Sequence, residues 1–256
     1  MSVREVELPG CDRALTVHQA DTGSEVLADD AGAVVWDSAL VLIHYLAKLR
    51  QQQAQREPAR PRGVPLAGAR VLELGAGTGA VGLAAALLGA ARVLLTDRPH
   101  LMGLLNQNIE ANALGGSVAA VPYEWGGPLP DAAGFEGGFD LVLLSDLVYE
   151  PATLGPLVGT LAMLLGGSGG GGGGTAAAEA NGGAPHAAAG PGSGGAGAGG
   201  GPSVLVAVEL RTDTGVAQFV RALVQRGYYV ERVPGEELND DWRDDDIWVF
   251  VVRRQR

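Results

Sequence analysis

Hydrophobic and polar residues follow two different periods near the start of the chain. Residues 4–8 and 14–19 alternate apolar and polar side chains around the turn dipeptide Pro9-Gly10, which predicts a two-stranded ribbon. Over residues 36–49 the apolar positions recur at helical spacing. The polar stretch 51–62 that follows is expected to be a loop or a frayed helix end.

Short apolar runs then alternate with amphipathic segments along the rest of the chain. Strand-like runs occupy 70–74, 92–96, 140–144 and 203–208, and helix-like segments occupy 80–88, 101–112, 154–165 and 216–226. One more strand is expected just before Trp125, and two more at 228–233 and 247–252. Strands that alternate with helices predict an α/β fold with a doubly wound, Rossmann-like parallel sheet. The last two of its seven strands are expected to pair antiparallel, because the acidic stretch between them has no helical face.

A low-complexity segment interrupts this alternation. Residues 166–202 are almost entirely Gly, Ala, Ser and Pro, with too little apolar surface to offset the entropy of ordering them. They are interpreted as a disordered insertion, either an inert repeat expansion or a partner-binding tether. The remainder has the length of one domain, so residues 1–256 are taken as a single domain with residues 1–30 as its N-terminal ribbon.

Composition and charge narrow the class of protein. The formal net charge of -11 argues against a general nucleic-acid binder, which needs clustered Lys and Arg. The single cysteine, Cys11, can form neither an internal disulfide nor a cysteine-based metal site, and no metal is expected. No apolar stretch is long enough to cross a bilayer, and no export signal is evident. The expected location is the cytoplasm, with the nucleus as a second compartment.

Residues 71–83 carry the most chemical information. They join a buried strand, a glycine turn and the start of a helix. Gly75, Gly77 and Gly79 have no Cβ at the positions where a ligand would touch the backbone. Glu73 is an acid in an otherwise apolar strand, and its burial requires a partner. A cationic small molecule would provide that partner.

Two nucleotide cofactors fit this turn. Gly77, Gly79 and Gly82 match the G-x-G-x-x-G pattern of dinucleotide-binding proteins, so a nicotinamide cofactor is one alternative. Glu73, two residues ahead of the glycines, suits the ammonium group of S-adenosyl-L-methionine, and Asp97 can accept the ribose hydroxyls of either cofactor. Too little chain follows for the substrate domain of a dehydrogenase. We therefore favour S-adenosyl-L-methionine over a nicotinamide cofactor and over a ligand-free turn.

A second group of polar residues follows the strand that ends near residue 144. Ser145, Asp146 and Tyr149 come just past its carboxyl end, where a doubly wound sheet places its active site. Asp146 and Tyr149 are therefore candidates to orient a nucleophile, and the alternative role for Asp146 is a helix cap. Trp125 is positioned to stack on adenine and Trp36 to cover the methionine end of the cofactor, with core packing as the alternative for both.

Taken together, several segments resemble the methyltransferase-16 family of seven-strand protein-lysine methyltransferases. They are Val34–Leu42, the glycine turn, Asp97, Trp125, Ser145–Tyr149, Glu209–Thr212 and Asp241–Trp248. Two features depart from the family pattern: the Gly/Ala insertion, and Ser145, which stands where a small apolar residue is common.

The resemblance implies specific roles for residues. The cofactor S-adenosyl-L-methionine would be held by Trp36, Gly75, Ala76, Gly77, Asp97, Trp125 and Ser145. Asp146 and Tyr149 would form the family's substrate motif. The implied partner is a protein that bears the target lysine, and the family branch that acts on the AAA ATPase called valosin-containing protein is most similar. The alternatives are an Hsp70-type chaperone or an elongation factor as substrate, methylation of histidine, and a non-catalytic adaptor.

Overall fold

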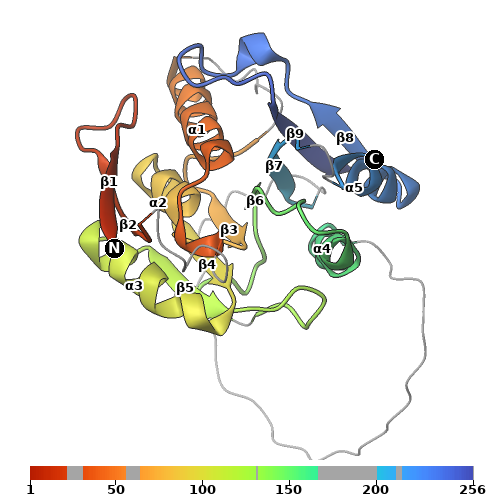
Figure 1. Ribbon diagram of the computed structural model, residues 1–256, viewed down its shortest axis with the longest axis horizontal. Helices are drawn as coiled ribbons and strands as arrows, with labels where there is room; N and C mark the ends of the chain where they lie inside the picture. Colours follow the sequence, from red (N-terminus) through yellow and green to blue (C-terminus); the bar gives the residue numbers. More distant parts are fainter. Residues whose placement is uncertain (22–30, 56–63, 131, 167–200, 212–214, 256) are drawn as a thin grey trace, which may run out of the picture.

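The computed structural model describes residues 1–21, 31–55, 64–130, 132–166, 201–211 and 215–255. They form one seven-stranded sheet with helices on both faces, and a separate two-stranded ribbon (Figure 1). The ribbon strands are β1 (Ser2–Val6) and β2 (Leu15–Gln19). The strands of the main sheet are β3 (Arg70–Leu74), β4 (Arg92–Asp97), β5 (Val118–Pro122), β6 (Leu141–Ser145), β7 (Ser203–Glu209), β8 (Tyr228–Arg232) and β9 (Ile247–Arg254). The helices are α1 (Asp37–Gln55), α2 (Ala80–Leu87), α3 (Met102–Ala111), α4 (Pro151–Leu164) and α5 (Val216–Gln225).

The strand order is β5-β4-β3-β6-β7-β9-β8, and it confirms the doubly wound methyltransferase-type sheet. Strands β3 to β7 pair in parallel, whereas β9 inserts between β7 and β8 and is antiparallel to both. The predicted antiparallel pairing of the last two strands is therefore correct. The chain order reverses between β3 and β6, and this switch point is where such sheets bind ligands.

Two hydrophobic cores lie on opposite faces of the sheet. One contains residues of α1, α2 and α3, and the other contains residues of α4 and α5. Successive side chains of β3 alternate between them, since Val71 packs in the first core and Leu72 and Leu74 in the second. The same alternation directs Glu73 toward the first face, which places an acid on a side that is otherwise apolar.

Helix α1 is longer than the sequence pattern predicts. The stretch expected to be a loop or a frayed helix end is helical as far as Gln55, and residues 56–62 lie outside the described part of the chain. Polar side chains of this last part hold neighbouring backbone: the Arg50 side chain donates to the Leu88 carbonyl (3.1 Å) and the Gln53 amide to the Val64 carbonyl (2.8 Å). Gln and Arg are also good helix formers, so the loss of apolar periodicity does not end the helix.

The N-terminal ribbon is fastened to α3 by two asparagine side chains. Asn108 accepts from the His18 amide (2.7 Å) and donates to its carbonyl (3.0 Å), and Asn112 makes the same pair of bonds with Thr16. These bonds satisfy backbone groups along the open edge of β2. The ribbon is confirmed, although β1 begins two residues earlier than predicted, at Ser2, and residues 22–30 of its predicted range lie outside the description.

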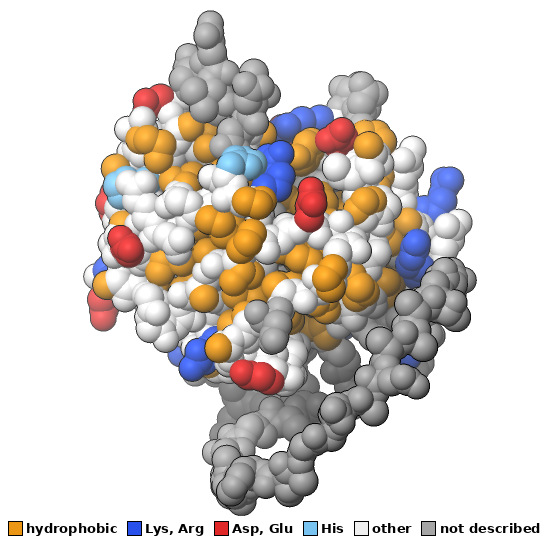
Figure 2. Space-filling model, turned by 90° about the horizontal axis from the view of Figure 1, so that it is seen from below, with side chains coloured by type: hydrophobic (Ala, Val, Ile, Leu, Met, Phe, Trp, Pro, Cys, Tyr) orange, Lys and Arg blue, Asp and Glu red, His pale blue; other side chains and the backbone are white. Residues whose placement is uncertain are grey.

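The predicted disordered insertion lies almost wholly outside the described residues, which stop at residue 166 and resume at 201. Its two flanks meet, because a Cβ placed on Gly201 would lie 3.3 Å from the carbonyl oxygen of Leu165. Figure 2 shows one face of the molecule, with apolar side chains gathered across its middle and charged ones spaced around them. Among the described residues, no helix is both long and apolar enough to cross a membrane.

Candidate active site

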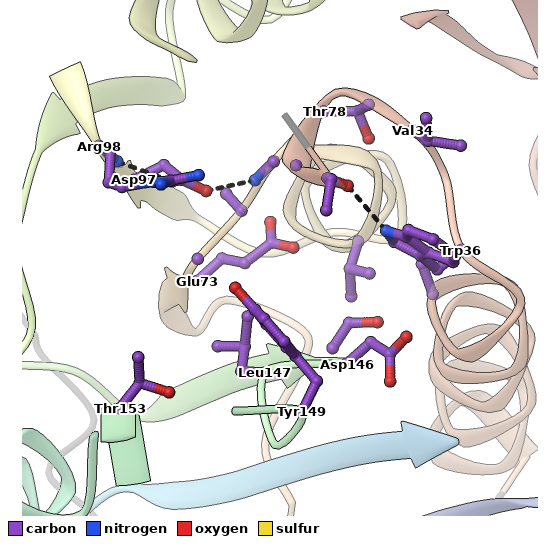
Figure 3. A pocket seen from close by; sticks show the side chains of 18 of the residues that line it. Val34, Trp36, Glu73, Thr78, Asp97, Arg98, Asp146, Leu147, Tyr149 and Thr153 are labelled. Atoms are coloured by element: carbon purple, nitrogen blue, oxygen red, sulfur yellow. Dashed lines mark hydrogen bonds between the residues drawn. The ribbon is translucent and has the colours of Figure 1, made fainter. Parts of the chain in front are cut away.

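A pocket of about 460 Å³ opens at the carboxyl ends of β3, β4 and β6, beside the start of α1 (Figure 3). This volume falls within the usual range for sites that hold small molecules. All ten residues that the sequence singled out line it: Trp36, Glu73, Gly75, Ala76, Gly77, Asp97, Trp125, Ser145, Asp146 and Tyr149. In the view of Figure 3, Asp97 and Glu73 lie on one side and Trp36 and Asp146 on the other, with Tyr149 between them.

The glycine turn is shaped by its protein neighbours. Gly75, Gly77 and Gly79 have φ values of +57°, +56° and +78°, a left-handed conformation that other residues adopt only with strain. A Cβ on Gly75 would lie 2.5 Å from a methyl group of Leu147, and one on Gly77 would collide with the carbonyl oxygen of Gly32. The backbone conformation and the packing therefore require glycine at these positions, independently of any ligand.

Glu73 has a partner within the protein. Its Oε2 accepts a hydrogen bond from the Gly82 amide (2.8 Å), in the first turn of α2, where the N-cap residue Gly79 has no side chain to do so. This bond supplies the partner that burial requires, so burial alone does not prove a cationic ligand. Glu73 is 2% exposed, and burial raises its pKa to about 8; the Gly82 bond opposes this rise and Asp97 adds to it.

Asp97 ends β4 with both carboxylate oxygens aimed at backbone amides. Oδ2 accepts from Gly77 (2.7 Å) and Oδ1 accepts from Arg98 (2.7 Å). Burial raises the pKa of Asp97 while these two bonds lower it. Each carboxylate oxygen can accept more than one hydrogen bond, so this arrangement ties the glycine turn to β4 and still leaves acceptor capacity toward the pocket.

The two tryptophans form walls of the pocket. Trp125 follows β5 and lies beside Gly75, and its loop is held by the buried Thr160 of α4, whose Oγ1 accepts from the Gly126 amide (2.9 Å). Trp36 precedes α1, is 37% exposed, and donates from Nε1 to the Ala31 carbonyl (2.9 Å). Neither is a simple core residue, since both border the pocket.

Ser145, which lines the pocket, contacts Ser38 of α1. Their hydroxyl oxygens are 3.1 Å apart, which links the end of β6 to the first turn of α1. Sequence reasoning singled out Ser145 but not its partner Ser38, because 107 positions separate the two residues.

Asp146 has an unusual backbone conformation at the end of β6. Its φ of +56° is rare for a residue other than glycine and is often found at functional sites. Oδ1 accepts from the Glu209 amide (3.3 Å), and Oδ2 pairs with the Arg211 guanidinium (3.2 Å). Burial raises the pKa of Asp146, and the Glu209 bond and the Arg211 charge oppose that rise. The helix-cap alternative is wrong, because the N-cap of α4 is Glu150.

Arg211 lines the pocket and contacts Asp146, but sequence reasoning gave it no role. It was noted within the segment Glu209–Thr212 but given no role, although it follows the carboxyl end of β7 as Asp146 follows that of β6. Its guanidinium lies 5.0 Å from the ring centre of Trp36 and pairs with Asp146 and Glu209. Within the described part of the chain, no group of three or more His, Cys, Asp or Glu side chains could hold a metal ion.

The sheet order and this pocket define an α/β protein with the Rossmann-like methyltransferase fold. A family model described as lysine methyltransferase matches residues 19–173, more than half of the sequence. The chain therefore belongs to the lysine methyltransferase family.

Individual relatives agree with this assignment. The chain is 41% identical over 138 residues to protein N-lysine methyltransferase METTL21A of Danio rerio, covering 53% of this chain and 56% of that protein. It is 29% identical over 244 residues to EEF1A lysine methyltransferase 3 of Mus musculus, covering 95% of this chain and 78% of that protein. The match to METTL21A thus spans little more than half of that relative's length. These relatives support the family and do not single out the AAA ATPase branch.

Among solved structures, the mitomycin 7-O-methyltransferase MmcR is similar with a TM-score of 0.50 and 14% identity, covering 82% of this chain and 54% of that chain. At this identity the likeness shows the fold alone.

The pocket residues fit S-adenosyl-L-methionine. Acidic side chains, among them Glu73, Asp97 and Asp146, line the cavity together with many apolar residues, which suits a ligand with two cationic groups and a ribose. The raised pKa of Glu73 means that a bound cation would favour its ionised form. The nicotinamide alternative loses support at Gly79, the second glycine of its pattern, which would have to approach the pyrophosphate but packs against Leu95 and Leu105 and does not line the cavity.

Proposed function

We propose that this protein is an S-adenosyl-L-methionine-dependent protein-lysine N-methyltransferase. The observation that carries the proposal is the meeting of the glycine turn, Asp97 and Asp146 in one pocket of a chain that belongs to the lysine methyltransferase family. The cofactor supplies a methyl group on a sulfonium centre. The chain's own residues bind it, orient the acceptor amine and exclude water.

The residues divide into two groups by position. Glu73, the turn at 75–77, Asp97 and Trp125 lie around the ends of β3, β4 and β5 and are proposed to hold the cofactor. Asp146 and Tyr149 follow β6 and are proposed to orient the amine. Tyr149 is 50% exposed, so its ring is available to an incoming side chain. Holding the amine in line with the transferred methyl group supplies much of the rate by orientation.

The acceptor must also be uncharged. With a free pKa near 10.4, roughly one lysine in 2,500 is neutral at pH 7, a cost of about 4.6 kcal/mol. An apolar pocket that already holds a cationic cofactor disfavours the ammonium form, because it offers little hydration and a like charge. The proposed mechanism therefore depends more on the position and desolvation of the amine than on a strong base.

Two substrates are supported by particular observations. Elongation factor 1A is the first candidate, because the relative that aligns with 95% of this chain is named for that substrate. An AAA ATPase of the valosin-containing type is the second, on the resemblance of residues 241–248 to the enzyme that modifies it. The ring of Trp242 in this segment stacks on His44 of α1 at 4.3 Å between ring centres, so the segment has a fixed place beside the helix that begins at the pocket. We propose the cytoplasm, with the nucleus as a second compartment, as the site of action.

The test is transfer of labelled methyl groups to a panel of recombinant proteins and to a cell extract. The panel contains elongation factor 1A, an Hsp70-type chaperone and valosin-containing protein, and mass spectrometry identifies the modified residue. Methylated lysine in one band supports the proposal. Methylated histidine would overturn the lysine assignment, and cofactor binding without transfer to any protein would make the chain an adaptor.

Asp146→Asn is the matched variant for this experiment. It keeps the size of the side chain and removes its charge, so we expect methyl transfer to fall by about 100-fold or more while cofactor affinity stays within about twofold. Calorimetric titration with S-adenosyl-L-methionine measures the affinity. Unchanged turnover in this variant would remove Asp146 from the mechanism.

A further inference from the structure

The mouth of the pocket contains a guanidinium between two carboxylates and an aromatic ring. Nη2 of Arg211 lies 3.2 Å from Oδ2 of Asp146, and its Nε lies 3.0 Å from Oε2 of Glu209. The guanidinium is also 5.0 Å from the ring centre of Trp36. The side chain of Asp146 is 9% exposed and that of Arg211 is 42% exposed, so the arginine covers a nearly buried acid.

Acidic groups from three elements lie at or near this mouth. Asp37 comes from the first turn of α1, Asp146 follows β6, and Glu209 ends β7. Both Asp37 and Glu209 raise the pKa of Asp146 by charge repulsion, whereas Arg211 lowers it. Tyr149 borders the same space, and the charged residues farther along the pocket wall are Glu73, Asp97, Arg98, Glu124 and Glu150.

Without a compensating cation, such a mouth would favour the ammonium form of a lysine, which cannot accept a methyl group. Nearby carboxylates stabilise an ammonium ion and raise its pKa, whereas a nearby positive charge destabilises it. A methyl acceptor reacts only after it loses its proton. Among the described residues, Arg211 is the cation that acts on Asp146, so it decides how negative the mouth is toward an incoming amine.

We propose that Arg211 is a positioning residue for the methyl acceptor: by pairing with Asp146 and Glu209, it prevents these carboxylates from holding the target side chain as an ammonium ion. This inference rests on the proposed lysine methyltransferase function. Arginine suits the role because its planar fork bridges two carboxylates, stacks on Trp36 and stays charged at every physiological pH. Asp146 is thereby left to orient a neutral amine.

A binding experiment tests this effect without turnover. The probe is n-butylamine, which is the end of a lysine side chain and is an ammonium ion near neutral pH. It is titrated into protein saturated with S-adenosylhomocysteine, and the nuclear magnetic resonance signal of the Trp36 indole N–H reports binding. Arg211→Gln should bind the probe about tenfold more tightly than the wild type. Arg211→Lys, which keeps the charge but loses the planar fork, should bind the probe less tightly than Arg211→Gln does.

A second variant guards against a folding defect in the first. Asp37→Asn removes a negative charge from the same mouth, so it should weaken butylammonium binding, opposite in sign to Arg211→Gln. Equal thermal midpoints and equal affinity for S-adenosylhomocysteine establish that the variants are intact. Butylammonium binding that is no tighter in Arg211→Gln than in the wild type, or undetectable in both, overturns the inference.

Turnover supplies the second readout, with whichever protein of the panel is methylated. The rise of kcat with pH reports groups in the enzyme–substrate complex, and in Arg211→Gln it should move about one unit to higher pH without an increase in KM. The pH profile of Arg211→Lys should lie between those of the wild type and Arg211→Gln. Parallel pH profiles in the wild type and Arg211→Gln overturn the inference. If the wild-type protein methylates nothing in the panel or the extract, the proposed function is overturned instead. The butylamine titration still tests the effect of Arg211 in that case, because it needs no turnover.

Discussion

At the scale of single residues, Glu73 combines nearly complete burial with a place on the wall of the pocket. Its neutral form prevails near pH 7, because burial raises the pKa to about 8. In the folded protein without cofactor, Glu73 keeps its proton up to about pH 8, whereas in the unfolded chain it loses the proton above about pH 4.5. This group therefore makes the folded state less stable as pH rises from 4.5 toward 8. A cationic ligand reverses the preference, since it stabilises the ionised carboxylate.

Glu73→Gln should remove this pH dependence. In the wild type we expect affinity for S-adenosyl-L-methionine to rise by up to about tenfold per pH unit below 8, with release of up to one proton, and to level off above pH 8 without proton release. Calorimetry in two buffers of different ionisation enthalpy measures both the affinity and the proton. The glutamine variant should bind with a flat profile over this range, and an equally steep profile there would refute the assignment.

Gly75 offers a second test at this scale. Alanine there must adopt φ +57° and approach Leu147, so Gly75→Ala should destabilise the fold by about 2 kcal/mol or more and weaken cofactor binding. Gly103, in helix α3 with open space around it, is the matched control, and Gly103→Ala should stabilise the fold by about 0.5–1 kcal/mol. Urea unfolding measures both changes. Equal effects at the two sites would contradict the role of backbone strain.

At the scale of elements, the pocket depends on contacts between segments far apart in sequence. The loop that carries Trp125 is held by Thr160 of α4, which bonds the Gly126 amide at 2.9 Å and the Tyr123 hydroxyl at 3.2 Å. Thr160 is fully buried. The position of Trp125 therefore depends on α4, a helix that comes after β6 in the chain.

Thr160→Val should show this dependence. It keeps the volume but leaves the Gly126 amide without its acceptor, so we expect a loss of about 1–3 kcal/mol in stability and weaker cofactor binding. Thr160→Ser retains the hydroxyl and should keep the affinity close to that of the wild type. Thermal unfolding measures the stability of the two variants, and calorimetric titration measures their cofactor affinity. Equal cofactor affinity in both variants would disprove the dependence of the cofactor site on the Thr160 hydroxyl.

At the scale of the whole molecule, the long segment between α4 and β7 joins two ends that already touch, at Leu165 and Gly201. The sheet pairs β7 with β6 and β9 and needs only a short connection there. The free energy of closing a loop grows with the logarithm of its length. A shorter connection is thus compatible with the same fold.

Deleting residues 170–197 should leave the fold intact and increase stability by at most about 2 kcal/mol. Methyl transfer to an isolated substrate should also be retained, because the pocket residues are all outside the deleted segment. Thermal unfolding and the labelling assay check both outcomes. A large loss of transfer with unchanged stability would support the tether interpretation of this segment.

The sequence by itself determined the sheet, its antiparallel end and ten of the residues that line the pocket. Apolar periodicity reports which side chains are buried, and residues just past the ends of parallel strands meet at one edge. The same rule, applied to β7, would have identified Arg211.

Only the tertiary structure decided what these residues do to one another. Local patterns did not show that α1 continues to Gln55, that Gly82 satisfies Glu73, or that Leu147 and Gly32 crowd the glycine turn. Nor did they show the pairing of Arg211 with Asp146, 65 positions away. Such contacts depend on distances between segments that only folding brings together, and they set the charge and shape of the pocket.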